Sequence, residues 1–126
     1  FKAAFPFGHG LSYTTFLYGA ARVLADGCAG AACVRLTVAN SGNRLGAELA
    51  QAYLRFPPGA GEPDLVLRGF ERTRVLGPGE QQELTFVFSA RDLSIYDPAA
   101  GGWLQQSGMQ VLIGASSADI RQVVPL

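Results

Sequence analysis

Stretches in which apolar and polar residues alternate recur about every ten residues along the chain. The clearest runs from Cys33 to Asn40, where Val34, Leu36 and Val38 share one side. A period of two with β-branched residues is typical of a strand with one buried face. Two further stretches show the same alternation and predict these inward side chains: Ala50, Ala52, Leu54 and Phe56 within Glu48–Phe56, and Leu84, Phe86 and Phe88 within Gln81–Ser89.

A fourth extended stretch, from Asp64 to Leu76, has an interrupted rhythm. A bulge at Gly69 would keep Leu67 and Phe70 on the same side, because a bulge adds one residue to a strand. We therefore expect this stretch to supply four core side chains: Leu65, Leu67, Phe70 and Val75.

Turn-forming residues separate these stretches, and the last third of the chain continues the pattern. It predicts one helical turn and four short strands: Ala90–Leu93, then Ser94–Asp97, Trp103–Gln105, Met109–Ala115 and Ile120–Val124. No stretch shows the periodicity of a long amphipathic helix. About seven short strands predict an all-β fold, a two-sheet antiparallel immunoglobulin-like (fibronectin type III-like) β-sandwich, which we place at residues 14–126.

Residues 1–13 do not fit the strand pattern and are expected to form an extended connector. A solvated linker would not expose so many large apolar side chains, so we expect the connector to cover another surface. Phe1 is not an initiator methionine and no signal-peptide pattern follows it, so the numbering is expected to begin inside a longer polypeptide. The interface residues would be Phe5, Pro6, Phe7, Gly8, His9, Gly10, Leu11 and Tyr13.

The text of the connector and of five later segments resembles one family. FPFGHGLSYTTF, from Phe5 to Phe16, is similar to the signature through which family 3 glycoside hydrolases, particularly β-glucosidases and β-xylosidases, enter their C-terminal domain. The other segments follow in the same order along nearly the whole chain: Val38–Gly42, Glu48–Leu54, Leu67–Arg72 followed by Leu76–Glu80, Leu93–Asp97 with Trp103, and Gly114–Ile120.

The resemblance implies an enzyme that hydrolyses terminal β-linked sugars with retention. Its nucleophile would lie on a barrel domain and its acid/base on an α/β domain, and neither domain is in this chain. The resemblance therefore assigns no catalytic residue, no cofactor and no metal ligand here. It implies a non-catalytic accessory domain of a secreted or periplasmic enzyme. The partners would be the barrel domain and the α/β domain of the same polypeptide, the connector packing on the latter, with polysaccharide as a further candidate.

The chain's own polar residues do not indicate a separate catalytic site. Four loop carboxylates are expected to be solvated or to cap turns: Glu62, Asp64, Asp92 and Asp97. Three serines have only His9 as a candidate base and none lies in a nucleophile elbow: Ser12, Ser116 and Ser117. His9 itself is interpreted as a loop residue at a domain interface rather than a pH-responsive group.

Two other classes of function stay open on the sequence. A carbohydrate-binding module needs exposed coplanar aromatic rings, for which the candidates are Trp103, Tyr96, Tyr53 and Tyr18. A lone tryptophan beside short hairpin arms is more typical of a core or edge anchor. A free-standing adhesion sandwich is the third hypothesis, because this fold hosts many functions.

Composition and charge reduce the number of possible functions further. With 48% hydrophobic and 16% charged residues the chain is expected to fold. Ten basic and ten acidic residues balance, which argues against nucleic-acid binding, and no apolar run is long enough to span a membrane. Cys28 and Cys33 are too few for a zinc site. They are either free thiols near a loop or a local disulfide worth at most about 2 kcal/mol, and the family resemblance does not require them.

Overall fold

The computed structural model describes residues 14–57 and 65–126 of the chain. No helix occurs among them, so the described part has no helix that could cross a membrane. The strands are β1 (Phe16–Tyr18), β2 (Arg22–Val23), β3 (Ala32–Asn40), β4 (Leu49–Arg55), β5 (Val66–Arg72), β6 (Gln81–Phe88), β7 (Ser94–Asp97), β8 (Gly102–Gln105), β9 (Gln110–Ser116) and β10 (Asp119–Pro125).

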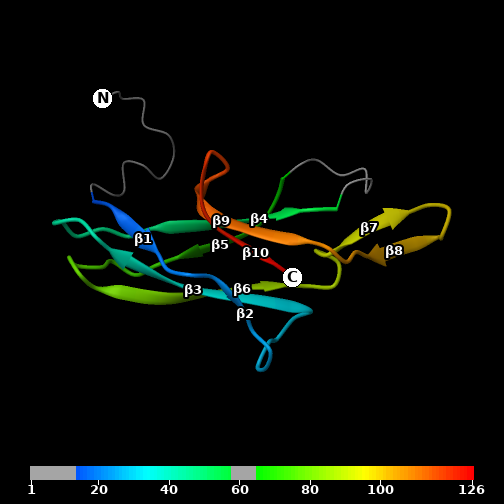
Figure 1. Cartoon of the computed structure of the whole chain (residues 1–126), viewed down its shortest axis with the longest axis horizontal. Coiled ribbons are helices and arrows are strands. Elements are labelled where there is room, and N and C mark those ends of the chain that lie inside the picture. Colours follow the sequence, from blue (N-terminus) through cyan, green and yellow to red (C-terminus); the bar gives the residue numbers. More distant parts are fainter. Residues whose placement is uncertain (1–13, 58–64) are drawn as a thin grey trace.

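Of the ten strands in the described residues, eight form two antiparallel sheets that pack face to face (Figure 1). In the β3 sheet, β3 pairs with β6 along one edge and with both β1 and β2 along the other. In the β4 sheet the order is β10-β9-β4-β5. The predicted two-sheet sandwich is confirmed. It has more strands than expected because β1 and β2 pair separately with different parts of β3.

The core lies between the two sheets and follows the alternation seen in the sequence. The side chains predicted to point inward from β3, β4 and β6 are all buried, and so is Phe56. Strand β9 adds Val111 and Ile113, which are fully buried. Each large apolar side chain buried in this way stabilises the fold by about 1.5–3 kcal/mol.

Strand β5 contains the expected bulge, but the prediction of its core residues is wrong. Gly69 pairs with Ala52 and Leu67 pairs with Tyr53, so that one residue of β5 lies unpaired between them. The bulge keeps Leu67 and Phe70 on the same side, yet both are exposed.

The residues that β5 and the following loop give to the core are different ones. Val66 packs against the core and Leu76 is fully buried, whereas Val75 is exposed and Leu65 is only partly buried. The inward position beside Ala52 belongs to Gly69, where a Cβ would lie 3.2 Å from the ring of Phe86. A side chain at that position would crowd the ring of Phe86, and the register that turns Gly69 inward places the apolar pair on the outside.

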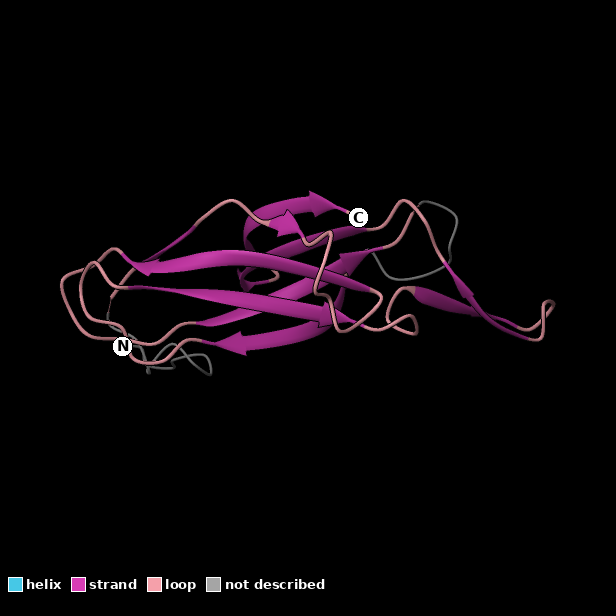
Figure 2. Cartoon of the chain, turned by 90° about the horizontal axis from the view of Figure 1, so that it is seen from below, coloured by secondary structure: helices cyan, strands magenta, loops and turns pink. Residues whose placement is uncertain are grey.

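Strands β7 and β8 form a separate two-stranded ribbon that projects from one end of the sandwich (Figure 2). Tyr96 pairs directly with Trp103 across it. The ribbon follows a turn in which the Leu93 N–H donates to the Ala90 carbonyl oxygen at 3.2 Å. The two short arms expected from the sequence are therefore present.

Candidate functional site

The predicted interface residues lie outside the described part of the chain, as do Ser12, Glu62 and Asp64. The first described residues are Thr14 and Thr15, which lead into β1. The structure therefore describes the residues directly after the connector and their attachment to the sandwich, but not the predicted interface itself. The interface residues concerned are Phe5, Pro6, Phe7, Gly8, His9, Gly10, Leu11 and Tyr13.

A buried asparagine at the end of β3 holds the chain at Thr14. Asn40 is 1% exposed. Its Nδ2 donates to the carbonyl oxygens of Arg44 and Leu76, both at 2.8 Å. Its Oδ1 accepts from the Thr14 hydroxyl at 2.9 Å and from the Gly42 N–H at 3.0 Å. The two donors and two lone pairs of the amide are thus all used, and they join the entering chain to two loops.

The next residue continues this attachment. The Ser41 N–H donates to the Thr15 carbonyl oxygen at 2.9 Å, and the two hydroxyl oxygens of these residues lie 2.9 Å apart. The sequence Asn40-Ser41-Gly42, which predicts a turn, therefore also binds residues 14 and 15 through hydrogen bonds. We call these contacts the Asn40 anchor.

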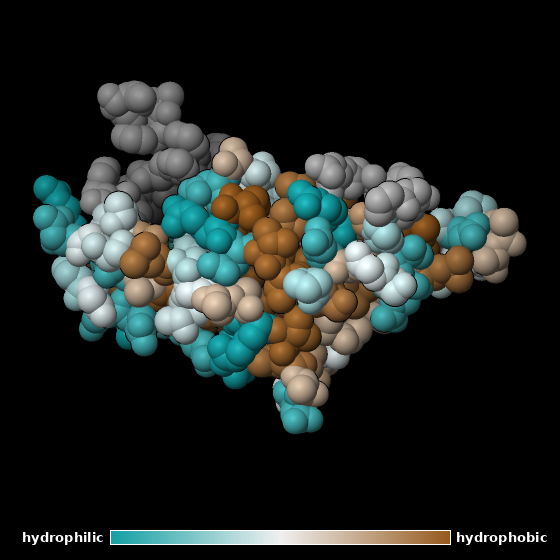
Figure 3. Space-filling model, in the orientation of Figure 1, coloured by the Kyte–Doolittle hydropathy of each residue, from teal (hydrophilic) through white to brown (hydrophobic). Residues whose placement is uncertain are grey.

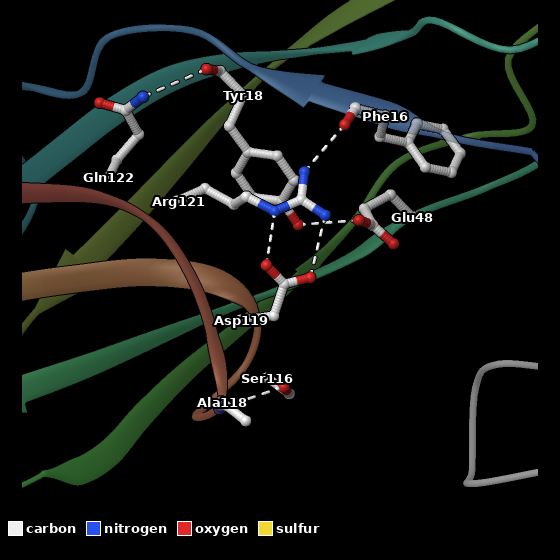
Figure 4. A network of polar contacts seen from close by, with 8 residues as sticks. All are labelled: Phe16, Tyr18, Glu48, Ser116, Ala118, Asp119, Arg121 and Gln122. Atoms are coloured by element: carbon white, nitrogen blue, oxygen red, sulfur yellow. Dashed lines mark hydrogen bonds and ion pairs between the residues drawn. The ribbon is translucent and has the colours of Figure 1, made fainter.

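A second group of contacts ties β1 to the opposite sheet (Figure 4). Arg121 of β10 donates from Nη1 to the Phe16 carbonyl oxygen at 2.9 Å. Its Nε and Nη2 donate to the two carboxylate oxygens of Asp119 at 2.7 and 2.9 Å. Its Cζ lies 5.2 Å from the centre of the Tyr18 ring. A planar guanidinium can make these contacts at once, so this one side chain bridges the two sheets.

The buried ring of Tyr18 completes this group, which we call the Arg121 clamp. The Tyr18 hydroxyl donates to Glu48 Oε2 at 2.9 Å, and Gln122 Nε2 donates to the Tyr18 carbonyl oxygen at 3.2 Å. Strand β1 is only three residues long, yet it is held by side chains from the β4 sheet as well as by β3. The chain that leaves the connector is therefore fixed to both layers.

The pKa values of Tyr18 and Glu48 in the clamp are raised, and that of Asp119 is lowered. Burial raises the pKa of the Tyr18 phenol, and the Glu48 carboxylate beside it raises it further. Burial also raises the pKa of Glu48 above its usual 4.5, although the hydrogen bond from Tyr18 and the charge of Arg121 oppose this. The hydrogen bonds from Arg121 lower the pKa of Asp119 below 3.8.

Replacing Glu48 with Gln should make stability less dependent on pH between 4.5 and neutrality. A pKa that is raised in the folded state gives stability that is present below the unfolded value and lost as pH rises through the folded value. Glutamine still accepts the Tyr18 hydrogen bond but carries no charge to desolvate. The free energy of unfolding of Glu48→Gln relative to the native chain should therefore improve as pH rises through this window. Urea unfolding at a series of pH values measures this difference.

Asp119→Asn is the matched variant, because the pKa of Asp119 is shifted in the opposite direction to that of Glu48. The pKa of Asp119 is lowered in the folded chain from its ordinary value of 3.8. Its contribution to the free energy of unfolding is therefore present above pH 3.8 and lost as the pH falls below that value. This variant should be less stable than the native chain at neutral pH and approach it in acid. If the difference in free energy of unfolding between Glu48→Gln and the native chain stays constant from pH 4.5 to neutrality, the raised pKa of Glu48 is contradicted.

The aromatic residues considered for carbohydrate binding divide into two pairs. Tyr18 and Tyr53 are buried, whereas Tyr96 and Trp103 of the ribbon are about half exposed. The two ribbon rings meet edge to face, with centres 5.5 Å apart and planes at 71°. The guanidinium of Arg91 lies 4.1 Å from the centre of the Trp103 ring. One face of the tryptophan is therefore covered, and the two rings do not form a flat platform.

The described loop carboxylates cap turns, as expected. Asp92 accepts from the Ser89 N–H at 2.8 Å, and Asp97 accepts from the Ala99 N–H at 2.9 Å. Ser116 Oγ accepts from the Ala118 N–H at 3.2 Å. These polar side chains therefore satisfy the backbone locally.

An open cavity of about 600 Å³ lies between the β2–β3 loop, the base of the ribbon and the last residue, Leu126. Figure 3 shows apolar residues in a band over β9 and β10 that runs toward β2. Among the residues that line the cavity, Asp26 is the one with a side-chain carboxylate. No group of three or more metal-ligating side chains occurs in the parts of the chain that the structure describes.

Cys28 and Cys33 are joined by a disulfide whose Cα atoms are 5.6 Å apart. It closes the loop between β2 and β3, at the edge of this cavity. Cys33 is buried at the start of β3, so the bridge ties the loop to the sandwich.

Sequence reasoning missed the residues that make these attachments. Asn40 was interpreted only as a turn residue, and Arg121 and Glu48 were given no role. A signal for Asn40 existed, because it ends an alternating strand in register with the buried side chains of that strand. No local pattern marks Arg121, whose partners in β1 are more than 100 residues away.

Comparisons with known proteins agree with this architecture. Residues 48–117 match the fibronectin type III-like domain family. The chain is 40% identical to probable β-glucosidase D of Aspergillus niger, over 93% of this chain and 18% of that protein. A β-D-glucoside glucohydrolase structure from Trichoderma reesei matches with a TM-score of 0.82 and 38% identity, over 95% of this chain and 19% of that one. The GH3 β-glucosidase structure of Bifidobacterium adolescentis matches with a TM-score of 0.81 and 34% identity, over 95% of this chain and 18% of that one. The chain thus spans less than a fifth of the length of these relatives.

Proposed function

The chain belongs to the fibronectin type III-like domain family, in the C-terminal form carried by family 3 glycoside hydrolases, and from this we propose that it is a non-catalytic accessory domain of a β-glucosidase-like enzyme. The whole enzyme would hydrolyse terminal β-linked sugars with retention, on a barrel domain and an α/β domain outside this chain. Residues 1–13 would be the connector that packs on the α/β domain, and residues 14–126 the sandwich.

The observation that carries this proposal is the double attachment of the chain at residues 14–18. The Asn40 anchor holds Thr14 to the loops at the end of β3, and the Arg121 clamp holds β1 to the β4 sheet. A segment fixed to both layers cannot swing freely. A body joined to the chain before Thr14 would therefore start from a fixed point on the sandwich, which supports a bracing role for the connector.

The acidic residues of the sandwich support a non-catalytic role. Retaining hydrolysis needs a nucleophile and an acid/base carboxyl about 5–5.5 Å apart across the scissile bond. Asp92 and Asp97 cap turns, and Glu83 lies 3.1 Å from Arg22. Glu48 and Asp119 belong to the Arg121 clamp. Structural partners therefore account for each of these carboxylates.

The bracing role predicts that the connector stabilises the full-length enzyme. Changing Phe5 and Phe7 together to Ser should lower the melting temperature of the full-length enzyme by several degrees and reduce hydrolysis of an aryl β-glucoside. The reason is that the apolar surface of the α/β domain would lose the two rings that cover it. Leu17→Ser is the control, since Leu17 is exposed on β1 outside the connector. Melting and activity that match the Leu17 control would reject the bracing role.

A carbohydrate-binding module is the second candidate, because the ribbon exposes Tyr96 and Trp103. We expect the isolated chain to elute from cellulose and other β-glucan columns without retention, since Arg91 covers one face of Trp103. Retention that is lost in Trp103→Ala would favour this candidate instead.

We assign the enzyme to a secreted or periplasmic location by analogy. The disulfide between Cys28 and Cys33 supports this assignment, because such bridges persist in oxidising compartments.

A further inference from the structure

The loop between β2 and β3 has an exposed apex that is held at both ends. On one side, the Leu24 N–H donates to the Cys33 carbonyl oxygen at 3.0 Å. On the other side, Cys28 is joined to the same Cys33 by the disulfide. Residues 25–27 lie between these two attachments and are exposed. The apex is therefore a short solvent-facing segment between two fixed points.

This apex contains an aspartate followed directly by a glycine, Asp26-Gly27. Neither the Asp26 carboxylate nor the Gly27 N–H takes part in a hydrogen bond or ion pair within the described part of the chain. Gly27 has a φ of 74°, and a Cβ there would meet nothing within 4 Å. Nothing crowds its nitrogen, and glycine changes its backbone angles at little steric cost. A side-chain carboxyl and an unbound backbone nitrogen are thus adjacent on a segment that can rearrange.

We infer that Asp26-Gly27 is a site of spontaneous succinimide formation, which converts Asp26 to isoaspartate. The Gly27 nitrogen attacks Cγ of the protonated carboxyl and forms a new N–Cγ bond. The carboxyl hydroxyl leaves as water with the proton of the Gly27 N–H, and a cyclic imide remains. Water then opens the imide. Cleavage of the N–Cγ bond returns aspartate, whereas cleavage of the bond from the nitrogen to the main-chain carbonyl carbon of Asp26 gives isoaspartate. The reaction needs no oxidant, and water is its one further reactant.

The other aspartates that the structure describes lack this combination of groups. Asp97 precedes Pro98, which has no N–H and cannot supply the attacking nitrogen. The Asp92 carboxylate accepts a hydrogen bond from a backbone N–H at 2.8 Å. Both carboxylate oxygens of Asp119 are bound by Arg121, at 2.7 and 2.9 Å. Within residues 14–57 and 65–126, the structure therefore singles out Asp26.

Asn40 provides the matched contrast, because an asparagine closes the same ring with loss of ammonia. Its Nδ2 is the group that would leave, and it is held by two hydrogen bonds of 2.8 Å to carbonyl oxygens. The attacking nitrogen would be that of Ser41, whose N–H is bound to the Thr15 carbonyl oxygen at 2.9 Å. Asn40 is also buried. The fold should therefore protect Asn40 while it leaves Asp26 reactive.

Isomerisation would change the wall of the neighbouring cavity. Asp26 lines the cavity of about 600 Å³ and supplies its one side-chain carboxylate. Isoaspartate adds a methylene group to the main chain and leaves the carboxylate directly on Cα. Because Leu24 and Cys28 are both held, the loop must take up the added length between them. The product is therefore a local change in the shape and charge of the cavity rim.

Ageing of the chain in slightly acidic and in neutral buffer tests the assignment. Trypsin cleaves after arginine, so the fragment 23–35 carries Asp26 as its one aspartate and contains no asparagine. After reduction, we expect this fragment to separate with time into two chromatographic species of equal mass. The new species alone should accept a methyl group from an isoaspartyl methyltransferase. Asn40, in the fragment 36–44, should stay intact in the folded chain and deamidate when the released peptide is aged.

Asp26→Glu is the control variant, because a glutamate would have to close a larger ring, which forms far more slowly. Methyl acceptance of the aged variant should fall to that of the fresh chain. If it persists, another residue is the reactive one and the inference is wrong.

Two further outcomes would overturn the inference. A fragment 23–35 that stays unmodified in the aged folded chain, while the released peptide isomerises, shows that the loop protects Asp26. Deamidation of Asn40 in the folded chain at the rate of the released peptide shows that the fold selects neither site. The proposed accessory function does not depend on Asp26 and stands or falls by the connector variant.

Discussion

Asn40→Ala is expected to lower the free energy of unfolding by about 2–4 kcal/mol, and the melting temperature by roughly 10 °C. The amide is buried and makes four hydrogen bonds, to Thr14, Gly42, Arg44 and Leu76. Alanine removes all four and leaves a cavity. The Leu76 carbonyl oxygen keeps a bond from the Gly46 N–H at 3.0 Å, so the loss falls mainly on the other three partners. Urea unfolding followed by circular dichroism measures the change.

Two neighbouring variants separate the causes. Ser41→Ala removes an exposed hydroxyl that contacts Thr15, and should cost less than about 1 kcal/mol. Asn40→Asp keeps the shape and the acceptor but replaces the two donated hydrogen bonds with a carboxylate facing two carbonyl oxygens. It should therefore be as destabilising as alanine at neutral pH, and less so in acid, where the carboxyl is protonated. An Asn40→Ala chain within 1 kcal/mol of Ser41→Ala would show that the anchor is not a major source of stability.

The parts of the fold that could be predicted are those that depend on local alternation. Strands β3, β4 and β6 place their apolar residues on one face because successive side chains of a strand point in opposite directions. That property needs no knowledge of the partner strands. The turn residues between the strands and the two arms of the ribbon were predicted for the same reason.

The residues that sequence reasoning misjudged are those whose environment depends on the opposite layer. The pattern of β5 gives the same spacing whether Leu67 and Phe70 point in or out, and the pairing of Gly69 with the inward Ala52 decides between the two. The partners of Arg121 likewise come from β1, at the other end of the chain. Such contacts exist only once the sheets have packed, so a single sequence does not reveal them.

The hairpin between β9 and β10 links the clamp to the backbone geometry of the β4 sheet. Gly114 pairs with Ile120, and the register of β10 shifts on both sides of that pair. A Cβ on Gly114 would lie 2.0 Å from the carbonyl oxygen of Asp119 and 2.8 Å from the Cα of Ile120. Both atoms are backbone, so no rotation of a side chain can make room. The close approach of β10 to β9 therefore requires a residue without Cβ.

Gly114→Ala is expected to destabilise the domain by about 3 kcal/mol, at the upper end of the range for an overpacked site, because β10 must move away from β9. The movement displaces Asp119 and with it Arg121, so the pH dependence assigned to Asp119 should weaken in this variant. Gly102→Ala is the matched control: a Cβ there meets nothing within 4 Å, and the change should be neutral or stabilise by about 0.4–1 kcal/mol. Chemical unfolding of both variants gives the comparison. If the two glycine variants unfold at the same denaturant concentration, the hairpin yields easily and Gly114 does not hold the clamp in place.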